Sequence, residues 1–153
     1  MTTQAEIDTF LAHKRFAIAG VSRQSRDFSR ELFRTFRKHG YDPVPVHPEA
    51  TEIEGVRCYA HVQDIEPPVE TVLVMTPAAV SIDVAGDCVA AGIKQVWFYR
   101  AAGNGSLNGE AIEHCRSNGV GVIPGECPMM FLSHGLVHRI HGWVKKIRGT
   151  YPN

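Results

Sequence analysis

The residues best suited to chemistry lie in one short stretch, a glycine turn followed by serines and arginines. The apolar run Phe16–Ala19 leads into Gly20, and Ser22 and Arg26 follow before a helical pattern begins. Phosphate sites are commonly built on a strand, a glycine turn and a helix, because the first helical turn offers unpaired N–H groups and a partial positive charge. The stretch Arg15–Gly40 therefore predicts a phosphate-binding turn.

Two further groups could take part in chemistry. Cys127 follows the last predicted strand, just before a proline and a helix, where a helix N-terminus would favour the thiolate. It could form a mixed disulfide with a ligand thiol or sense redox state, although a small buried cysteine in a turn is the simpler interpretation. His134, His138 and His141 share one face of a predicted helix and could bind a metal, although a polar or interface-facing row is the simpler interpretation.

The composition excludes several classes of function. The 153 residues include 16 Lys and Arg and 16 Asp and Glu, so the overall charge favours neither nucleic acid nor an anionic membrane as a partner. The polar start lacks the apolar segment of a signal peptide, and no apolar run reaches the roughly 18 to 20 residues that cross a bilayer. The four scattered cysteines are therefore expected to be reduced thiols of a cytoplasmic protein.

Strand and helix patterns alternate along the chain. Short apolar runs bounded by turn residues predict five strands, at Arg15–Ala19, Pro43–Val46, Thr71–Met75, Gln95–Phe98 and Val120–Ile123. Helical patterns are predicted at Ile7–Lys14, from Ser25–Asp27 to His39, from Thr76 as N-cap to Ala91, at Asn108–Asn118, and at Met130–Arg148.

This alternation predicts an α/β fold, a doubly wound and mainly five-stranded parallel sheet with helices on both faces, Rossmann-like, plus a C-terminal amphipathic helix. We expect a single domain over residues 1–153, with a core of about 14–131 and a helical extension over 132–153. Ligands of such sheets bind at the carboxyl ends of the strands. The candidate positions are Gly20–Ser22, His47-Pro48, Thr76-Pro77, Tyr99-Arg100 and Pro124–Cys127.

These strand ends do not fit an ordinary NAD site. The G-x-G-x-x-G fingerprint is missing because Ser22 and Ser25 replace the later glycines, and His47 replaces the acidic residue that binds the ribose. A histidine near several arginines suits a nucleotide with an extra phosphate, either NADP or CoA, unless the arginines are simply a solvated helix face. The arginines are Arg23, Arg26 and Arg30.

Five short motifs occur in order along the chain: Ile18–Ser22, Tyr41–Pro48, Thr76-Pro77, Val96-Trp97 and Glu126–Pro128. Together they resemble the small, single-domain CoA-binding proteins, whose domain is similar to the CoA-binding domain of the succinyl-CoA synthetase alpha subunit. The resemblance covers about Lys14 to Phe131. The loop Tyr99–Gly105 departs from the short form expected of this family.

The resemblance implies that CoA or an acyl-CoA lies along the strand ends. The pyrophosphate would lie on the first turn and the following helix, near Gly20, Val21, Ser22, Arg26 and Ser29. His47 and Pro48 would lie beside the adenosine phosphate. Thr76, Pro77 and Val80 would line the adenine or the pantetheine, with Tyr99 at the next strand end.

The sequence predicts binding rather than catalysis. It has no G-x-S-x-G elbow and no Ser–His–Asp order, and it leaves no room for the phosphohistidine segment and ATP-grasp partner that ligase chemistry needs. We expect a non-catalytic or regulatory module whose partner is a small molecule. The alternatives are an NADP-dependent oxidoreductase and a redox-sensing thiol protein that uses Cys127. The C-terminal helix could pack on the sheet or form a homo-oligomer with a second copy.

Overall fold

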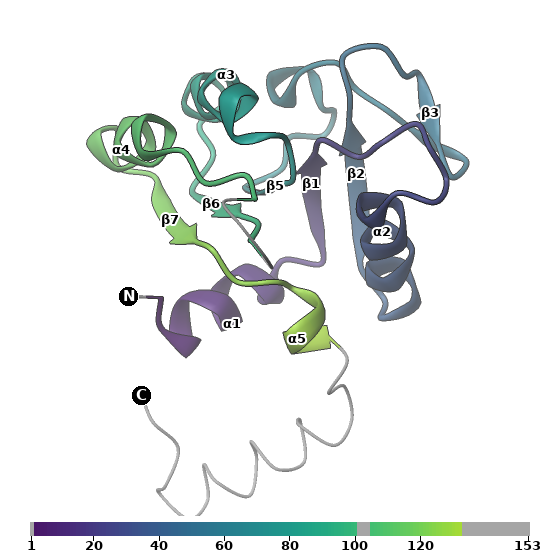
Figure 1. The fold of residues 1–153 in the computed structure, drawn as a ribbon, viewed down its shortest axis with the longest axis horizontal. Coiled ribbons are helices and arrows are strands. Elements are labelled where there is room, and N and C mark those ends of the chain that lie inside the picture. The colour runs from purple at the N-terminus through teal and green to yellow at the C-terminus, as the bar shows by residue number, and fades with distance from the viewer. Residues whose placement is uncertain (1, 101–104, 133–153) are drawn as a thin grey trace, which may run out of the picture.

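A five-stranded parallel sheet forms the centre of the fold (Figure 1). The structure is a computed structural model that describes residues 2–100 and 105–132. The sheet order is β2-β1-β5-β6-β7, and each neighbouring pair is parallel. The strands are β1 (Arg15–Ala19), β2 (Asp42–Val46), β5 (Thr71–Val74), β6 (Gln95–Phe98) and β7 (Gly121–Pro124). The predicted α/β, doubly wound, Rossmann-like fold is confirmed.

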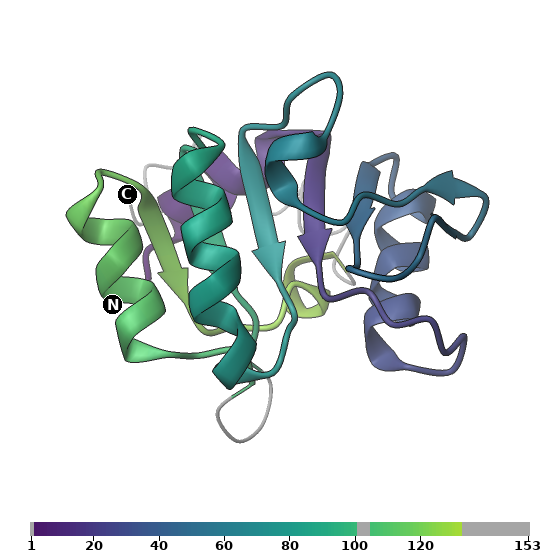
Figure 2. The same ribbon diagram turned by 90° about the horizontal axis from the view of Figure 1, so that it is seen from above.

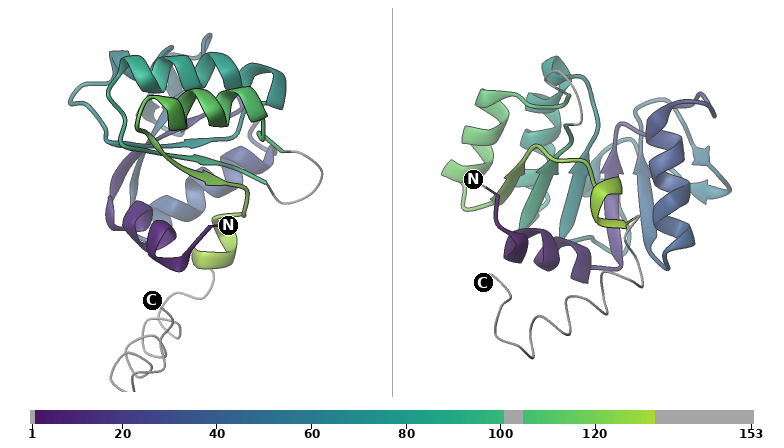
Figure 3. Two further views of the ribbon diagram at one scale, coloured as in Figure 1. Left: turned by 90° about the vertical axis from the view of Figure 1, so that its left-hand side faces the viewer. Right: turned by 60° about the horizontal axis from the view of Figure 1, so that its bottom comes forward.

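Helices cover both faces of the sheet, as Figures 2 and 3 show. One face carries α3 (Ala78–Ala90) and α4 (Gly109–Ser117), and the other carries α1 (Gln4–Ala12), α2 (Phe28–Lys38) and the short α5 (Met129–Leu132). The connection from β2 to β5 contains a small hairpin, β3 (Glu52–Ile53) and β4 (Val56–Arg57), and a 3-10 turn, η1 (Val62–Asp64).

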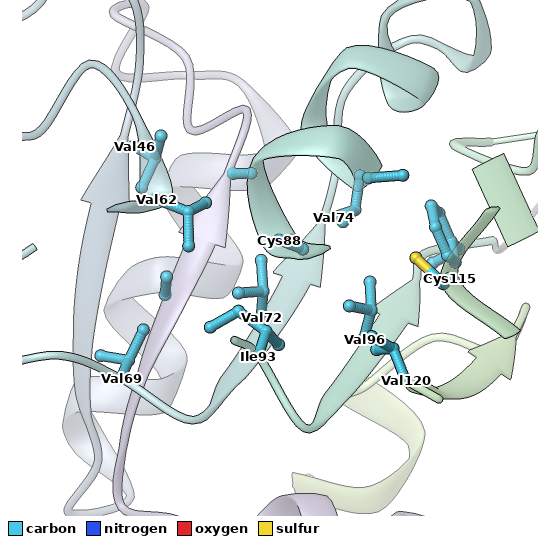
Figure 4. Packing of buried hydrophobic residues seen from close by; sticks show 14 of the residues in the cluster. Val46, Val62, Val69, Val72, Val74, Cys88, Ile93, Val96, Cys115 and Val120 are labelled. Atoms are coloured by element: carbon cyan, nitrogen blue, oxygen red, sulfur yellow. The ribbon is translucent and has the colours of Figure 1, made fainter. Parts of the chain in front are cut away.

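Successive residues of each strand enter two separate cores. On the α1–α2 face, the aromatic rings of Phe10, Phe16 and Trp97 pack edge to face, with centroids 5.3 to 5.4 Å apart. On the α3–α4 face, smaller side chains such as Val72 and Val96 pack beneath the helices (Figure 4). Burial on both faces explains why the strands are apolar almost throughout.

Some element boundaries differ from those predicted. α1 begins earlier, at Gln4, because Thr3 and Glu6 form a capping box. The prediction of Thr76 as the N-cap of α3 is wrong, since Pro77 holds that position without a side-chain bond. The Thr76 hydroxyl pairs with that of Ser81 instead.

Two other parts of the chain also depart from expectation. The β3–β4 hairpin lies where the sequence predicts only a loop. The predicted helix Met130–Arg148 meets the described residues only at α5, and its remainder, with His134, His138 and His141, lies outside them. Within residues 2–100 and 105–132, no helix is long and apolar enough to cross a membrane.

Candidate functional site

The carboxyl ends of the strands bring most of the predicted site residues to one edge of the sheet. Parallel pairing places Ala19 opposite both Val46 and Val74, so the residues that follow these strands are neighbours. The sheet winds in opposite directions from β1, and the switch lies between β1 and β5. Such a switch point is where doubly wound sheets bind ligands.

At this switch point, Gly20 lies close to the backbone that follows β5. Its φ is +95°, and a Cβ there would lie 2.8 Å from the Thr76 nitrogen and 2.9 Å from the Met75 carbonyl carbon. A side chain would therefore push the ends of β1 and β5 apart. The glycine is required by the backbone of the crevice itself, whether or not a ligand is bound.

The start of α2 does not offer the free helix N-terminus that the sequence predicts. Asp27 is the N-cap, and its Oδ1 accepts from the Ser29 backbone N–H at 2.9 Å and from the Ser29 hydroxyl at 2.6 Å. The Ser22 N–H in turn donates to the Ser29 hydroxyl oxygen at 2.8 Å. Ser29 is buried and fully engaged, so it ties the turn to α2 rather than facing the edge.

The orientation of the loop 22–26 is set by bonds to its carbonyls. Two arginines of α2 donate to them. Arg30 Nη1 donates to the carbonyls of residues 22 and 23 at 3.2 and 3.1 Å, and Arg34 Nη2 donates to that of residue 25 at 2.7 Å. In a trans peptide the N–H points opposite to the C=O. The N–H groups of Arg23 and Arg26 therefore point away from the guanidinium groups that bind the same peptides, in a stretch whose residues 23–26 are exposed.

The three arginines considered in the sequence have different partners. Arg23 pairs with Glu49 at 3.0 Å on the surface. Arg30 is 8% exposed and pairs with Glu54, so the prediction that it faces a ligand phosphate does not hold. Arg26 is exposed, and its side chain makes no ion pair or hydrogen bond with the described residues.

His47 lies on the β2 side of the turn, half-buried. Its Nδ1 accepts from the backbone N–H groups of Glu49 and Ala50 at 3.0 and 3.3 Å. In the neutral ring this assigns the proton to Nε2, which leaves Nε2 as a donor for a ligand. Pro48 is exposed beside it.

Buried hydroxyls fix the β5 side of the crevice. Thr76 Oγ1 lies 2.9 Å from Ser81 Oγ, which lies 2.8 Å from the Ser106 carbonyl oxygen. Ser106 Oγ donates to the Val74 carbonyl at 2.8 Å. Thr76 is thus part of the frame, and the first turn of α3 presents its apolar side chains, including the exposed Val80, at the edge.

Tyr99 continues the edge toward β7. Its ring lies 5.7 Å from that of Phe28, and its pKa is raised first by burial and then by the nearby Cys127. Cys127 is 8% exposed and borders an open depression of about 580 Å³. The depression is lined by Arg100, Pro124, Gly125, Glu126, Cys127 and Met130.

Sequence reasoning missed the contribution of Glu54 and Phe28. Glu54 lies in the β3–β4 turn and binds two arginines of α2, which no local pattern reveals. Phe28 is the first residue of α2 and reads as part of its apolar stripe, yet it packs on Tyr99 at the edge. In residues 2–100 and 105–132, no group of three or more His, Cys, Asp or Glu residues could hold a metal ion.

Curated relatives match most of this chain. YneT of Bacillus subtilis, an uncharacterised protein, is 27% identical over 126 residues, which cover 82% of this chain and 90% of that protein. The ADP-forming acetate–CoA ligase of Methanocaldococcus jannaschii is 23% identical over 125 residues, which cover 79% of this chain. This chain spans only 18% of the length of the ligase.

Solved structures share the fold. A hypothetical protein from Pyrococcus horikoshii OT3 matches with a TM-score of 0.78 and 25% identity over 90% of this chain and 93% of that one. The dinucleotide-forming acetyl-coenzyme A synthetase 1 of Ca. Korarchaeum cryptofilum matches with a TM-score of 0.62 and 23% identity over 71% of this chain and 25% of that one. At that identity the second match shows a common fold alone.

A model of the CoA binding domain matches residues 14–133. The match includes all five strands of the sheet and the whole edge described above. The chain therefore belongs to the CoA binding domain family.

Proposed function

We propose that this chain binds CoA or an acyl-CoA along the carboxyl edge of its sheet, with the diphosphate on the loop 22–26. The observation that carries the proposal is that the Arg23 and Arg26 N–H groups point away from the arginines that bind the same peptides, in an exposed loop at the switch point of a CoA binding domain. Backbone N–H groups that converge beside a cation form a favourable anion site, because they need no rearrangement to meet the charge.

The other parts of the ligand follow the order of the strand ends. His47 Nε2 is a donor for a phosphate on the adenosine ribose, and Pro77 and Val80 offer surface to the adenine or the pantetheine. β7 lies three strands from β1, which is about 14 Å at ordinary strand spacing. An extended pantetheine arm corresponds to just over four residues, about 15 Å. The thiol of CoA can therefore reach Tyr99 and Cys127.

The same edge supports binding without a reaction. Two of its hydroxyl groups form hydrogen bonds within the protein: Ser22 Oγ accepts from the Gln24 N–H, and Thr76 Oγ1 pairs with Ser81 Oγ. In the described part of the chain, no histidine ring bonds to a hydroxyl or thiol side chain as a nucleophile and its base would. We propose a non-catalytic module, whose output is the bound ligand or its effect on a partner.

Calorimetric titration with CoA, dephospho-CoA, NADP and NAD tests the proposal. We expect CoA to bind most tightly, and dephospho-CoA to bind more weakly because it lacks the phosphate that would meet His47. Arg26→Gln should weaken CoA binding about tenfold through the loss of one charged hydrogen bond. Arg116→Gln, an exposed arginine in the last turn of α4, is the matched control and should have no effect. Binding of NADP without binding of CoA would refute the proposal in favour of an oxidoreductase.

A further inference from the structure

Three arginines of α2 converge on Glu54 in the turn of the β3–β4 hairpin. Arg30 Nη2 donates to Glu54 Oε2 at 2.6 Å, Arg34 Nε donates to Oε1, and Arg37 Nη1 donates to the Glu54 carbonyl at 3.1 Å. Hydrogen bonds from Arg30 and Arg34 hold the pKa of Glu54 below its ordinary value, so the carboxylate is charged at neutral pH.

Arg30 and Arg34 each bind the hairpin and the loop 22–26 at the same time. Arg30 uses one terminal nitrogen for Glu54 and the other for two loop carbonyls. Arg34 uses Nε for Glu54 and Nη2 for the Ser25 carbonyl. Arg37, by contrast, contacts the hairpin and makes no described bond to the loop. The planar guanidinium makes such double contacts, and an ammonium group cannot reproduce their geometry.

We infer that Arg30, Arg34 and Glu54 are positioning residues that hold the loop 22–26 ready for an anion before the ligand arrives. The inference rests on the proposed function, because it takes the loop as the site of the diphosphate. The arginines bind the Ser22 and Ser25 carbonyls, which turns the N–H groups of Arg23 and Arg26 away from α2's guanidinium groups. The single negative charge of Glu54 is shared by the two guanidinium groups and fixes their direction, so that they bind carbonyls rather than the ligand.

This arrangement lowers the cost of binding. A loop of five polar residues without regular structure would otherwise lose conformational entropy when it closes on a phosphate. A cation on the Ser22 or Ser25 carbonyl also polarises that peptide, which strengthens the N–H of the same unit as a donor. Because Arg30 is buried, its effect on the ligand must pass through the loop.

Arg34→Lys is the decisive variant, since it keeps the positive charge and replaces a partly exposed side chain. Lysine cannot hold Glu54 and the Ser25 carbonyl together, so we expect CoA to bind about tenfold more weakly. Arg37→Lys is the matched control, because it makes the same chemical change at an arginine that also contacts Glu54 but not the loop. This variant should bind CoA within about twofold of wild type. Glu54→Gln should act in the same direction as Arg34→Lys.

A second readout separates positioning from a general loss of stability. Inorganic pyrophosphate is titrated while the backbone amide resonances of Arg23 and Arg26 are followed by NMR. In the wild type we expect both resonances to shift. In Arg34→Lys the Arg26 shift should fall by about half or more, because the peptide that Arg34 orients carries that N–H.

The outcomes separate the two proposals. Wild-type protein that neither binds CoA nor responds to pyrophosphate refutes the proposed function itself. Wild type that binds, together with Arg34→Lys that binds equally well and keeps the Arg26 shift, refutes only the positioning role. An equal loss in Arg37→Lys also refutes it, since the loss would then not depend on contact with the loop. If Glu54→Gln fails to fold, the two lysine variants still decide the question.

Discussion

Replacing Gly20 with alanine tests whether the crevice depends on close contact between β1 and β5. The φ of +95° costs an L-residue about 1 to 2 kcal/mol. The new Cβ would also lie 2.8 and 2.9 Å from backbone atoms of Thr76 and Met75, which cannot move as a flexible side chain would. Overpacking of this kind costs about 1 to 3 kcal/mol. We expect Gly20→Ala to lower the free energy of unfolding by about 2 to 5 kcal/mol in urea denaturation.

Gly40 supplies the control, because its φ of +85° is similar and a Cβ there would meet nothing within 4 Å. Gly40→Ala should therefore lower the free energy of unfolding by only the backbone cost of a positive φ, about 1 to 2 kcal/mol. The difference between the two variants measures the contact at the switch point. Equal losses in both variants would refute the reasoning, since the close approach of the two strands would then cost nothing.

Three further predictions follow from the site. Asp27→Asn keeps the acceptor that caps α2 but removes a negative charge beside the loop 22–26. Calorimetry should therefore show about threefold tighter binding of CoA. Weaker binding would contradict this and mean that the carboxylate favours the ligand. The lowered pKa of Glu54 adds stability that is complete above the ordinary value of 4.5 and is lost as the pH falls from there through the folded-state pKa. The wild-type unfolding free energy should drop over that range, and the part of the drop due to this carboxyl should be missing in Glu54→Gln. Burial raises the pKa of the Cys88 and Cys115 thiols. After the native protein is treated with iodoacetamide, mass mapping should therefore find Cys127 alkylated before Cys88 or Cys115. Modification of all three cysteines at one rate would contradict the described packing.

The fold could be predicted largely from the sequence, because burial on two faces leaves a continuous apolar run. β1 and β6 begin and end at the predicted residues. Each run is bounded by residues that mark its ends, such as Lys14 before β1 and Gly20 after it. The β3–β4 hairpin could not be predicted, since two residues per strand are too few to show a period.

The edge of the site could be predicted, but not the bonds within it. Arg30 reads as a solvent-facing residue of α2, and its burial depends on Glu54, which is 24 residues away. Thr76 before a proline reads as an N-cap, yet its hydroxyl joins a network that reaches Ser106. In both cases the sequence shows that the residue is polar, but tertiary contacts that the local pattern does not show determine its hydrogen-bond partner.

The exposed apolar side chains have a thermodynamic consequence. Among the described residues, the exposed large hydrophobic side chains are Phe28, Val80 and Met130, at 37, 44 and 57%. Each lies in the first turn of a helix that starts at the carboxyl edge of the sheet. A ligand that covers them removes apolar surface from water, which makes the heat capacity change of binding negative. The temperature dependence of the binding enthalpy thus reports how far a ligand extends beyond its phosphates.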